Sequence, residues 1–159
     1  MDIVYEPIGV IHTPFKELSG MPIQSSGSQD TPGTVEVFHE YADGLMDIEG
    51  FSHVFLLYHF HGSQGYSLKV KPFLDDREHG VFSTRAPKRP NPIGLSVVRI
   101  ADRQDNILHI IDIDVLDGTP LLDIKPYVPD FDIKEVESIG WLSDNSHRVQ
   151  EARSDHRFV

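Results

Sequence analysis

The segment with the clearest potential for chemistry has four polar side chains spaced among three prolines. It reads Arg85-Ala86-Pro87-Lys88-Arg89-Pro90-Asn91-Pro92. Each proline fixes its own φ and favours extended geometry at the preceding residue, so Arg85, Arg89 and Asn91 should sit on a stiff connection between two strands. Rigid donors suit the binding of a carboxylate or phosphate, because little conformational entropy is lost on engagement. A proline-rich turn that only exposes basic residues explains the pattern equally well.

A second group consists of carboxylates around the end of one expected strand and the turn that follows it. Its members are Asp112, Asp114, Asp117 and Asp123. They could hold a cation, a cationic ligand or a proton in transfer, although Asp-Gly and Thr-Pro are also ordinary turn pairs. On the next extended segment Lys125 and Tyr127 alternate and should share a face, where an ammonium group and a phenol can together orient a polar substrate.

Two histidines, His59 and His61, stand two residues apart, with His53 upstream on the same face of an expected strand. Such a pair could bind zinc or iron, but the sequence fixes no third ligand, and satisfied core or rim histidines are commoner. We therefore predict no metal. The sequence also lacks the glycine-rich dinucleotide motif, the P-loop, the nucleophile elbow and the zinc-protease motif, so it gives no support to those enzyme classes.

Strand patterns dominate the elements that must position these groups. Apolar runs between Pro, Gly and Asp-Asn turns predict strands at 8–12, 33–38, 53–61, 79–84, 93–101 and 107–115. Helical signals are weak and limited to 41–46 and 132–138. Both faces of 53–61 are largely apolar, which favours a covered strand. Because no βαβ alternation is present, the pattern indicates a mainly β barrel or sandwich rather than a doubly wound sheet.

The expected strand at 107–115 changes character along its length. One face carries only Ile, His and Val side chains, whereas the other turns acidic at Asp112 and Asp114. The chain is short enough for a single domain, which we place at 1–142. A polar C-terminal tail should follow at 143–159.

Charge and composition restrict the partners. The net charge is −11, and phosphate contacts rest largely on Lys and Arg, so extensive nucleic-acid binding is disfavoured. Eight of the fourteen Lys and Arg residues nevertheless lie between positions 69 and 103, which leaves room for a local basic patch or for solvated strand ends. Without cysteines, a membrane-length apolar run or a signal peptide, we expect a cytoplasmic protein with neither membrane nor DNA as partner.

The two clusters, with several shorter stretches, resemble the TsaA-like (TrmO) family. The resemblance runs from about position 8 to 132 and rests on 80–96 and 114–127 together with Ile8-Gly9-Val10-Ile11, Thr13-Pro14-Phe15, Pro22-Ile23-Gln24, Gly50-Phe51-Ser52-His53 and Phe60-His61. It implies a single-domain β-barrel methyltransferase outside the Rossmann class, acting as a homodimer with S-adenosylmethionine. Bacterial members methylate N6 of threonylcarbamoyl-adenosine beside the tRNA anticodon. Many of them continue into an extra C-terminal domain, where this chain has only its polar tail.

The resemblance also implies which residues form the site. The cofactor-binding set is Gln24, Ser25, Ser26, Gly27, His61, Gly62, Arg85, Leu95, Ile111, Asp112, Ile113 and Asp114. For catalysis we favour Asp114 as the base, with Tyr127 or Asp117 orienting it. The threonyl carboxylate or a nearby phosphate would meet Lys125, Arg89 and Asn91. Three alternatives stay open: methyl transfer to a small metabolite, a non-catalytic barrel that binds a nucleoside or the cofactor, and a metal enzyme using His59 and His61.

Overall fold

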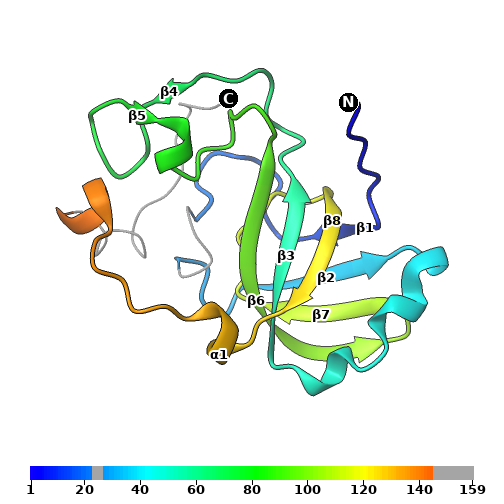
Figure 1. The fold of residues 1–159 in the computed structure, drawn as a ribbon. Coiled ribbons are helices and arrows are strands. Elements are labelled where there is room, and N and C mark those ends of the chain that lie inside the picture. The colour runs from blue at the N-terminus through cyan, green and yellow to red at the C-terminus, as the bar shows by residue number, and fades with distance from the viewer. Residues whose placement is uncertain (23–26, 145–159) are drawn as a thin grey trace.

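The fold is a closed antiparallel barrel (Figure 1). Residues 1–22 and 27–144 are described by a computed structural model, and within them six strands close in the order β1-β2-β7-β6-β3-β8. Their bounds are β1 Gly9–His12, β2 Pro32–Val37, β3 His53–His59, β6 Ile93–Gln104, β7 Ile107–Ile111 and β8 Thr119–Pro126. The predicted mainly β barrel is therefore confirmed.

The core fills the barrel interior, because inward residues alternate with outward ones along each strand. In β3, Val54, Leu56 and Tyr58 point inward and are at most 4% exposed, whereas the outward residues are half-buried. The ring of Tyr127 covers part of that outer face by edge contact with Phe55 at 5.3 Å. The inner face is therefore covered and the outer face only partly covered, and the strand ends at His59 rather than at residue 61.

The strand predicted at 107–115 is shorter than expected, since β7 ends at Ile111. Asp112 adopts a left-handed backbone with φ of +73°, a conformation that Asp tolerates better than most residues. This reversal breaks the alternation, and Ile113 and Val115 pack in the core beside Leu108 and Ile110. The predicted division into an apolar face and a face that turns acidic is therefore wrong beyond Ile111.

Two further predictions need correction. At 79–84 the strand is reduced to β5 (His79–Gly80), paired with β4 (Lys69–Val70), and a 3-10 turn, η4 (Val81–Ser83), follows it. The helix predicted at 132–138 lies earlier, as α1 (Pro129–Asp132), because Pro129 suits the first helical position. The helical turn predicted at 41–46 is present as η2 (His39–Leu45), followed by η3 (Ile48–Gly50).

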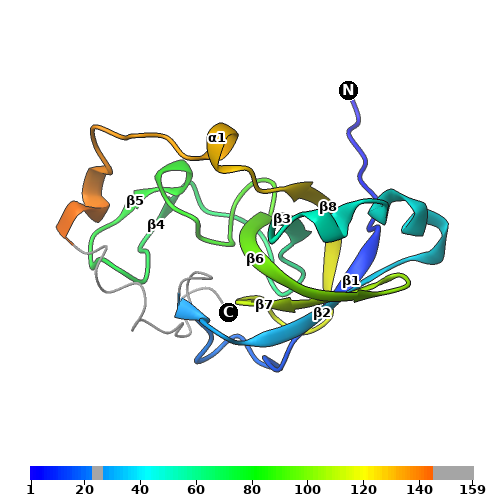
Figure 2. The same cartoon turned by 90° about the horizontal axis from the view of Figure 1, so that it is seen from below.

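Three long connections meet at one end of the barrel, where β1, β3 and β7 end and β2, β6 and β8 begin. They span residues 13–31, 60–92 and 112–118. We call 60–92 the excursion; it carries β4 and β5 and has its own small core of Val70, Val81, Ala86 and the partly buried Phe73. Figures 1 and 2 show the excursion standing beside the barrel end.

The C-terminal segment returns from the other end of β8 to the excursion (Figure 2). There the indole nitrogen of Trp141 donates to the carbonyl of Ser83 at 2.9 Å, and its ring stacks on His79 with centroids 4.5 Å apart. Trp141 belongs to η5 (Gly140–Asp144), which crosses the boundary predicted for the tail. No helix in the described part of the chain is long and apolar enough to span a membrane.

Candidate functional site

A chain of hydrogen bonds inside the barrel ends at a half-buried carboxylate. Ser96 Oγ donates to Asp114 Oδ1 at 2.5 Å, and the Tyr58 hydroxyl lies 2.9 Å from Ser96 Oγ. An ionised carboxylate can only accept, so the single proton of Ser96 is committed to Asp114. The Tyr58 hydroxyl must then donate to Ser96. β3, β6 and the loop after β7 each supply one member of this chain.

Burial sets the electrostatics of this group. Removal from water raises the pKa of Asp114 to about 6, against the opposing effects of the Ser96 hydrogen bond, a backbone hydrogen bond and the positive charge of Arg85. Burial likewise raises the pKa of Tyr58, which keeps its phenol protonated. Asp114 therefore exchanges its proton close to neutral pH, the property that a general base needs.

Gly94 makes the position of the Tyr58 ring possible. The two residues are directly opposite each other in the β3–β6 ladder. A Cβ atom at position 94 would collide with the Tyr58 ring and also lie too close to Phe60. A glycine inside a strand marks such a close approach, and here it lets the phenol reach Ser96.

Arg85 brings the proline-braced segment to this carboxylate. Its charge lowers the pKa of both Asp114 and Tyr58, so the basic and the acidic cluster meet at the same barrel end. The loop is held by Arg89, whose guanidinium Nη1 donates to the carbonyls of Thr84 and Ala86, both at 3.0 Å. Arg89 thus braces its own loop, a contact that the sequence did not reveal.

The predicted cofactor loop joins the same region at its C-terminal end. Ser28 Oγ donates to the carbonyl of Asp112 at 3.0 Å, and the backbone N–H of Asp30 donates to Asp112 Oδ1 at 2.7 Å. The N–H of Asp112 in turn donates to the carbonyl of Thr31 at 2.9 Å. Gly27 is therefore the residue next to Ser28, whose side chain is hydrogen-bonded to Asp112. Gln24, Ser25 and Ser26 lie outside the described residues.

The other predicted cofactor residues take different positions around this end. Gly62 faces the side chains of Leu18 and Leu116, which places it and His61 beside the acidic turn. Leu95 is 47% exposed on the outer face of β6. Ile113 is fully buried, so a ligand could reach only its backbone, and Ile111 ends β7.

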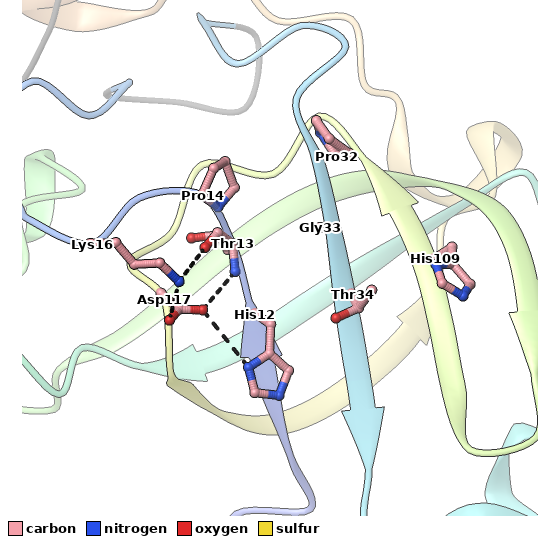
Figure 3. Close-up of a pocket in the computed structure, with 9 residues that line it drawn as sticks. All are labelled: His12, Thr13, Pro14, Lys16, Pro32, Gly33, Thr34, His109 and Asp117. Carbon is pink, nitrogen blue, oxygen red and sulfur yellow. Dashed lines mark hydrogen bonds and ion pairs between the residues drawn. The ribbon is translucent and has the colours of Figure 1, made fainter.

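Asp117 faces a different feature, an open hollow of about 390 Å³ on the outside of β1, β2 and β7 (Figure 3). Its carboxylate accepts from the Thr13 N–H at 2.9 Å and from Lys16 Nζ at 2.6 Å, and His12 Nδ1 lies 3.8 Å away. The Lys16 hydrogen bond is the main reason that the pKa of Asp117 is lowered. The structure therefore pairs Asp117 with β1 rather than with Asp114.

The remaining predicted residues are not gathered at Asp114. Lys125 pairs with Asp123 at 2.8 Å near the far end of β8, opposite Phe55. Tyr127 lies just past that end and packs on Phe55. With about 3.3 Å per strand residue, Lys125 is on the order of 20 Å from the start of β8. Asn91 is exposed in the excursion.

Sequence reasoning missed Tyr58, Ser96 and Gly94. One signal was available: Gly94 and Ser96 are small or polar at positions of β6 that alternation places inside. Their partner across the sheet depends on strand register, which the sequence does not show. Among residues 1–22 and 27–144, no three His, Asp or Glu side chains are grouped as a metal site.

The fold and site define a small β-barrel domain whose long connections gather at one end. The chain belongs to the tRNA-methyltransferase O N-terminal domain family, whose sequence model matches residues 10–133. The structure superimposes on the crystal structure of TrmO from Pseudomonas aeruginosa with a TM-score of 0.74 and 38% identity. That match covers 89% of this chain and 63% of the crystal chain.

Relatives carry two kinds of name. A probable S-adenosyl-L-methionine-binding protein of Pyrococcus abyssi is 59% identical over 98% of this chain and 85% of its own length. A tRNA (adenine(37)-N6)-methyltransferase of Homo sapiens is 36% identical over 82% of this chain. This chain spans only 31% of the human protein. The predicted family is therefore confirmed.

Proposed function

We propose that this protein is an S-adenosylmethionine-dependent methyltransferase acting on N6 of threonylcarbamoyl-adenosine in the tRNA anticodon loop. The observation that carries the proposal is the hydrogen-bond chain from Tyr58 through Ser96 to Asp114 at the loop-bearing end of the barrel, where the positive charge of Arg85 also acts on the Asp114 carboxylate. Family membership, the names of the relatives and the match to TrmO support the same activity.

The residues present suit S-adenosylmethionine, which carries both a carboxylate and positive charges and supplies an electrophilic methyl group. Arg85 offers a cation for the carboxylate, and Asp112 and Asp114 offer negative charge for the amino and sulfonium groups. The backbone of 111–114, Gly27 and the His61–Gly62 turn would surround the rest of the molecule; Gln24, Ser25 and Ser26 are further predicted contacts that lie outside the described residues. Leu95 adds apolar surface for the adenine or thioether.

In the proposed reaction, Asp114 accepts the N6 proton. The nitrogen then forms a bond to the methyl carbon as the carbon–sulfur bond breaks, and the electron pair stays on sulfur. A ureido N–H is more acidic than a plain amine, so a base with a pKa of about 6 suffices. Ser96 holds the carboxylate in place, and most of the acceleration comes from alignment of the reacting atoms.

The acceptor would be oriented by the excursion. Arg89 and Asn91 lie on the braced loop that also carries Arg85. Lys125 and Tyr127 lie toward the other end of β8, so a contribution from them requires the site of a second subunit. Asp117 would act by holding the turn after Asp114 against β1. Homodimer formation and a cytoplasmic location belong to the same proposal.

Two measurements test the proposal. Calorimetry with S-adenosylmethionine should show binding, and Arg85→Ala should weaken it. Incubation with tRNA that carries threonylcarbamoyl-adenosine, followed by nucleoside mass spectrometry, should show one added methyl group on that nucleoside. Binding without turnover on any tRNA would refute the enzymatic role, and turnover on a metabolite alone would refute the RNA substrate. Light scattering measures the oligomeric state.

A further inference from the structure

Positive charge in this acidic protein is concentrated in the excursion. Residues 60–92 carry six Lys or Arg side chains and three Asp or Glu side chains, a net charge of +3, whereas the rest of the chain carries −14. The rest of the surface therefore repels phosphate, and the excursion attracts it. A nucleic acid approaching this molecule is directed to one face.

Four cations of the excursion have no carboxylate partner in the described part of the chain. Elsewhere Lys16, Arg103 and Lys125 each contact a carboxylate at 2.6–2.8 Å. Within the described ranges no carboxylate pairs with the following excursion residues: Lys69, Lys71, Arg77 and Lys88. Unpaired cations on an acidic protein are available to phosphate groups, because binding them breaks no existing ion pair.

A small scaffold positions three of these cations, Lys69, Lys71 and Lys88. Val70 is buried in the excursion core, so its neighbours Lys69 and Lys71 point together to the outside. The N–H of Ser67 donates to the carbonyl of Lys88 at 3.3 Å, which brings Lys88 beside the start of β4. The cations are thus presented on an ordered surface rather than on a free loop.

Two exposed aromatic rings accompany the charges. Phe82, in η4, is 76% exposed, and Tyr66, next to Ser67, is 64% exposed. Aromatic side chains combined with cations form the usual platform for unstacked bases, because each base has a face on which a ring can stack. The loop that carries Arg85 follows η4 directly, so this platform leads to the candidate site.

We infer that the surface formed by Lys69, Lys71, Arg77, Lys88, Tyr66 and Phe82 binds the anticodon arm of the substrate tRNA. The cations contact the phosphate backbone, and the rings stack on loop bases and guide the target nucleoside to Asp114. This inference rests on the proposed function, since it names the surface by which the same site receives RNA. It adds an RNA contact that family membership does not specify.

The test is tRNA binding as a function of salt, measured by fluorescence anisotropy with the full chain. Replacing Lys69, Lys71, Arg77 and Lys88 together by Ala should weaken binding on the order of tenfold to a hundredfold at low salt. It should also reduce the slope of log affinity against log salt by about 3 to 4, since each of the four phosphate contacts contributes roughly 0.7 to 0.9. Phe82→Ala should weaken binding without changing that slope. The matched control is Lys134→Ala, an exposed cation outside the excursion.

Calorimetry with S-adenosylmethionine shows that each variant is folded and that its cofactor site is intact. Wild-type affinity and slope in the fourfold variant would overturn the inference, as would a change in oligomeric state without a change in RNA binding. If the wild-type protein itself neither binds nor methylates tRNA, the proposed function fails first. The two failures are therefore distinguishable.

Discussion

Asp114 and Asp117 lie three residues apart in one turn, yet their surroundings are opposite. Asp114 is enclosed at the barrel end, where burial raises the pKa of its carboxyl to about 6. Asp117 lies in the outer hollow, where Lys16 and the Thr13 N–H hold its pKa below the ordinary value. Ionising Asp114 destabilises the folded state, whereas ionising Asp117 stabilises it.

This difference separates a group suited to chemistry from a group suited to stability. A carboxylate kept from water opposes folding at neutral pH, and such groups persist where function needs a shifted pKa. A carboxylate that ties a turn to the neighbouring strand has the opposite effect. Substitutions at the two positions should therefore change the free energy of unfolding in opposite directions and by different amounts.

The largest expected effect is on methyl transfer. Asp114→Asn keeps the shape and the hydrogen bond from Ser96 but cannot take a proton, so the rate of tRNA methylation should fall by about 10² to 10⁴. Nucleoside mass spectrometry measures the rate, and calorimetry checks that the cofactor still binds. Asp43→Asn, at an exposed position in η2, serves as the control. An Asp114→Asn variant of wild-type rate would remove this residue from the reaction.

The same substitution should make the protein more stable at neutral pH. The pKa of Asp114 is about 6 when folded and 3.8 in its ordinary state, so stability falls as pH rises between these values and stays low above them. The cost amounts to roughly 2–3 kcal/mol above pH 7. Asp114→Asn should recover about 1–3 kcal/mol at pH 8 and almost nothing at pH 3.5. Urea unfolding at both pH values measures the difference, and a loss of stability at pH 8 would contradict it.

Asp117→Asn should change stability in the opposite direction. Because the folded pKa of Asp117 is lowered, its contribution is present above the ordinary pKa and is lost as pH falls through the folded value. Solvent screens the exposed Lys16 partner, so the expected loss at pH 7 is only about 1 kcal/mol. The same unfolding series should show the loss shrinking toward pH 2.5. A pH-independent loss would show that the ion pair is not its cause.

The sequence predicted the framework of this arrangement better than its details. Strand patterns and turn residues located five of the six barrel strands, because alternation and proline or glycine breaks are local properties; β8 was expected only as an extended segment. The family resemblance also implied that Arg85 and Asp114 belong to one site. The conformation of Asp112 could not be predicted, because contacts with Asp30 and Thr31, some 80 residues away, hold it. Local residue types do not encode such contacts.

Register explains the other failures. Ser96 stood out only as a polar residue at an inward position of β6, and its role appears only when the β3–β6 ladder places Tyr58 opposite Gly94. Lys125 and Tyr127 were grouped with Asp114 because they follow it closely in sequence. The length of β8 carries them away from it toward the other end of the barrel. Nearness along the chain is a poor guide where a strand intervenes, since each residue adds about 3.3 Å.

The smallest effect, and the sharpest test of the hydrogen-bond chain, is a shift in the pH profile. The hydrogen bond from Ser96 lowers the pKa of Asp114 against the larger effect of burial, so Ser96→Ala should raise that pKa and move the acid limb of kcat/KM to higher pH. We expect a shift of about one unit or less. Tyr58→Phe removes only the donor to Ser96 and should shift the limb less, in the same direction. A carbon-13 titration of the Asp114 carboxyl measures the same pKa without turnover. If the pKa of Asp114 shifts but the pH profile of kcat/KM does not, the hydrogen bonds from Tyr58 and Ser96 set the pKa of Asp114, but Asp114 is not the base.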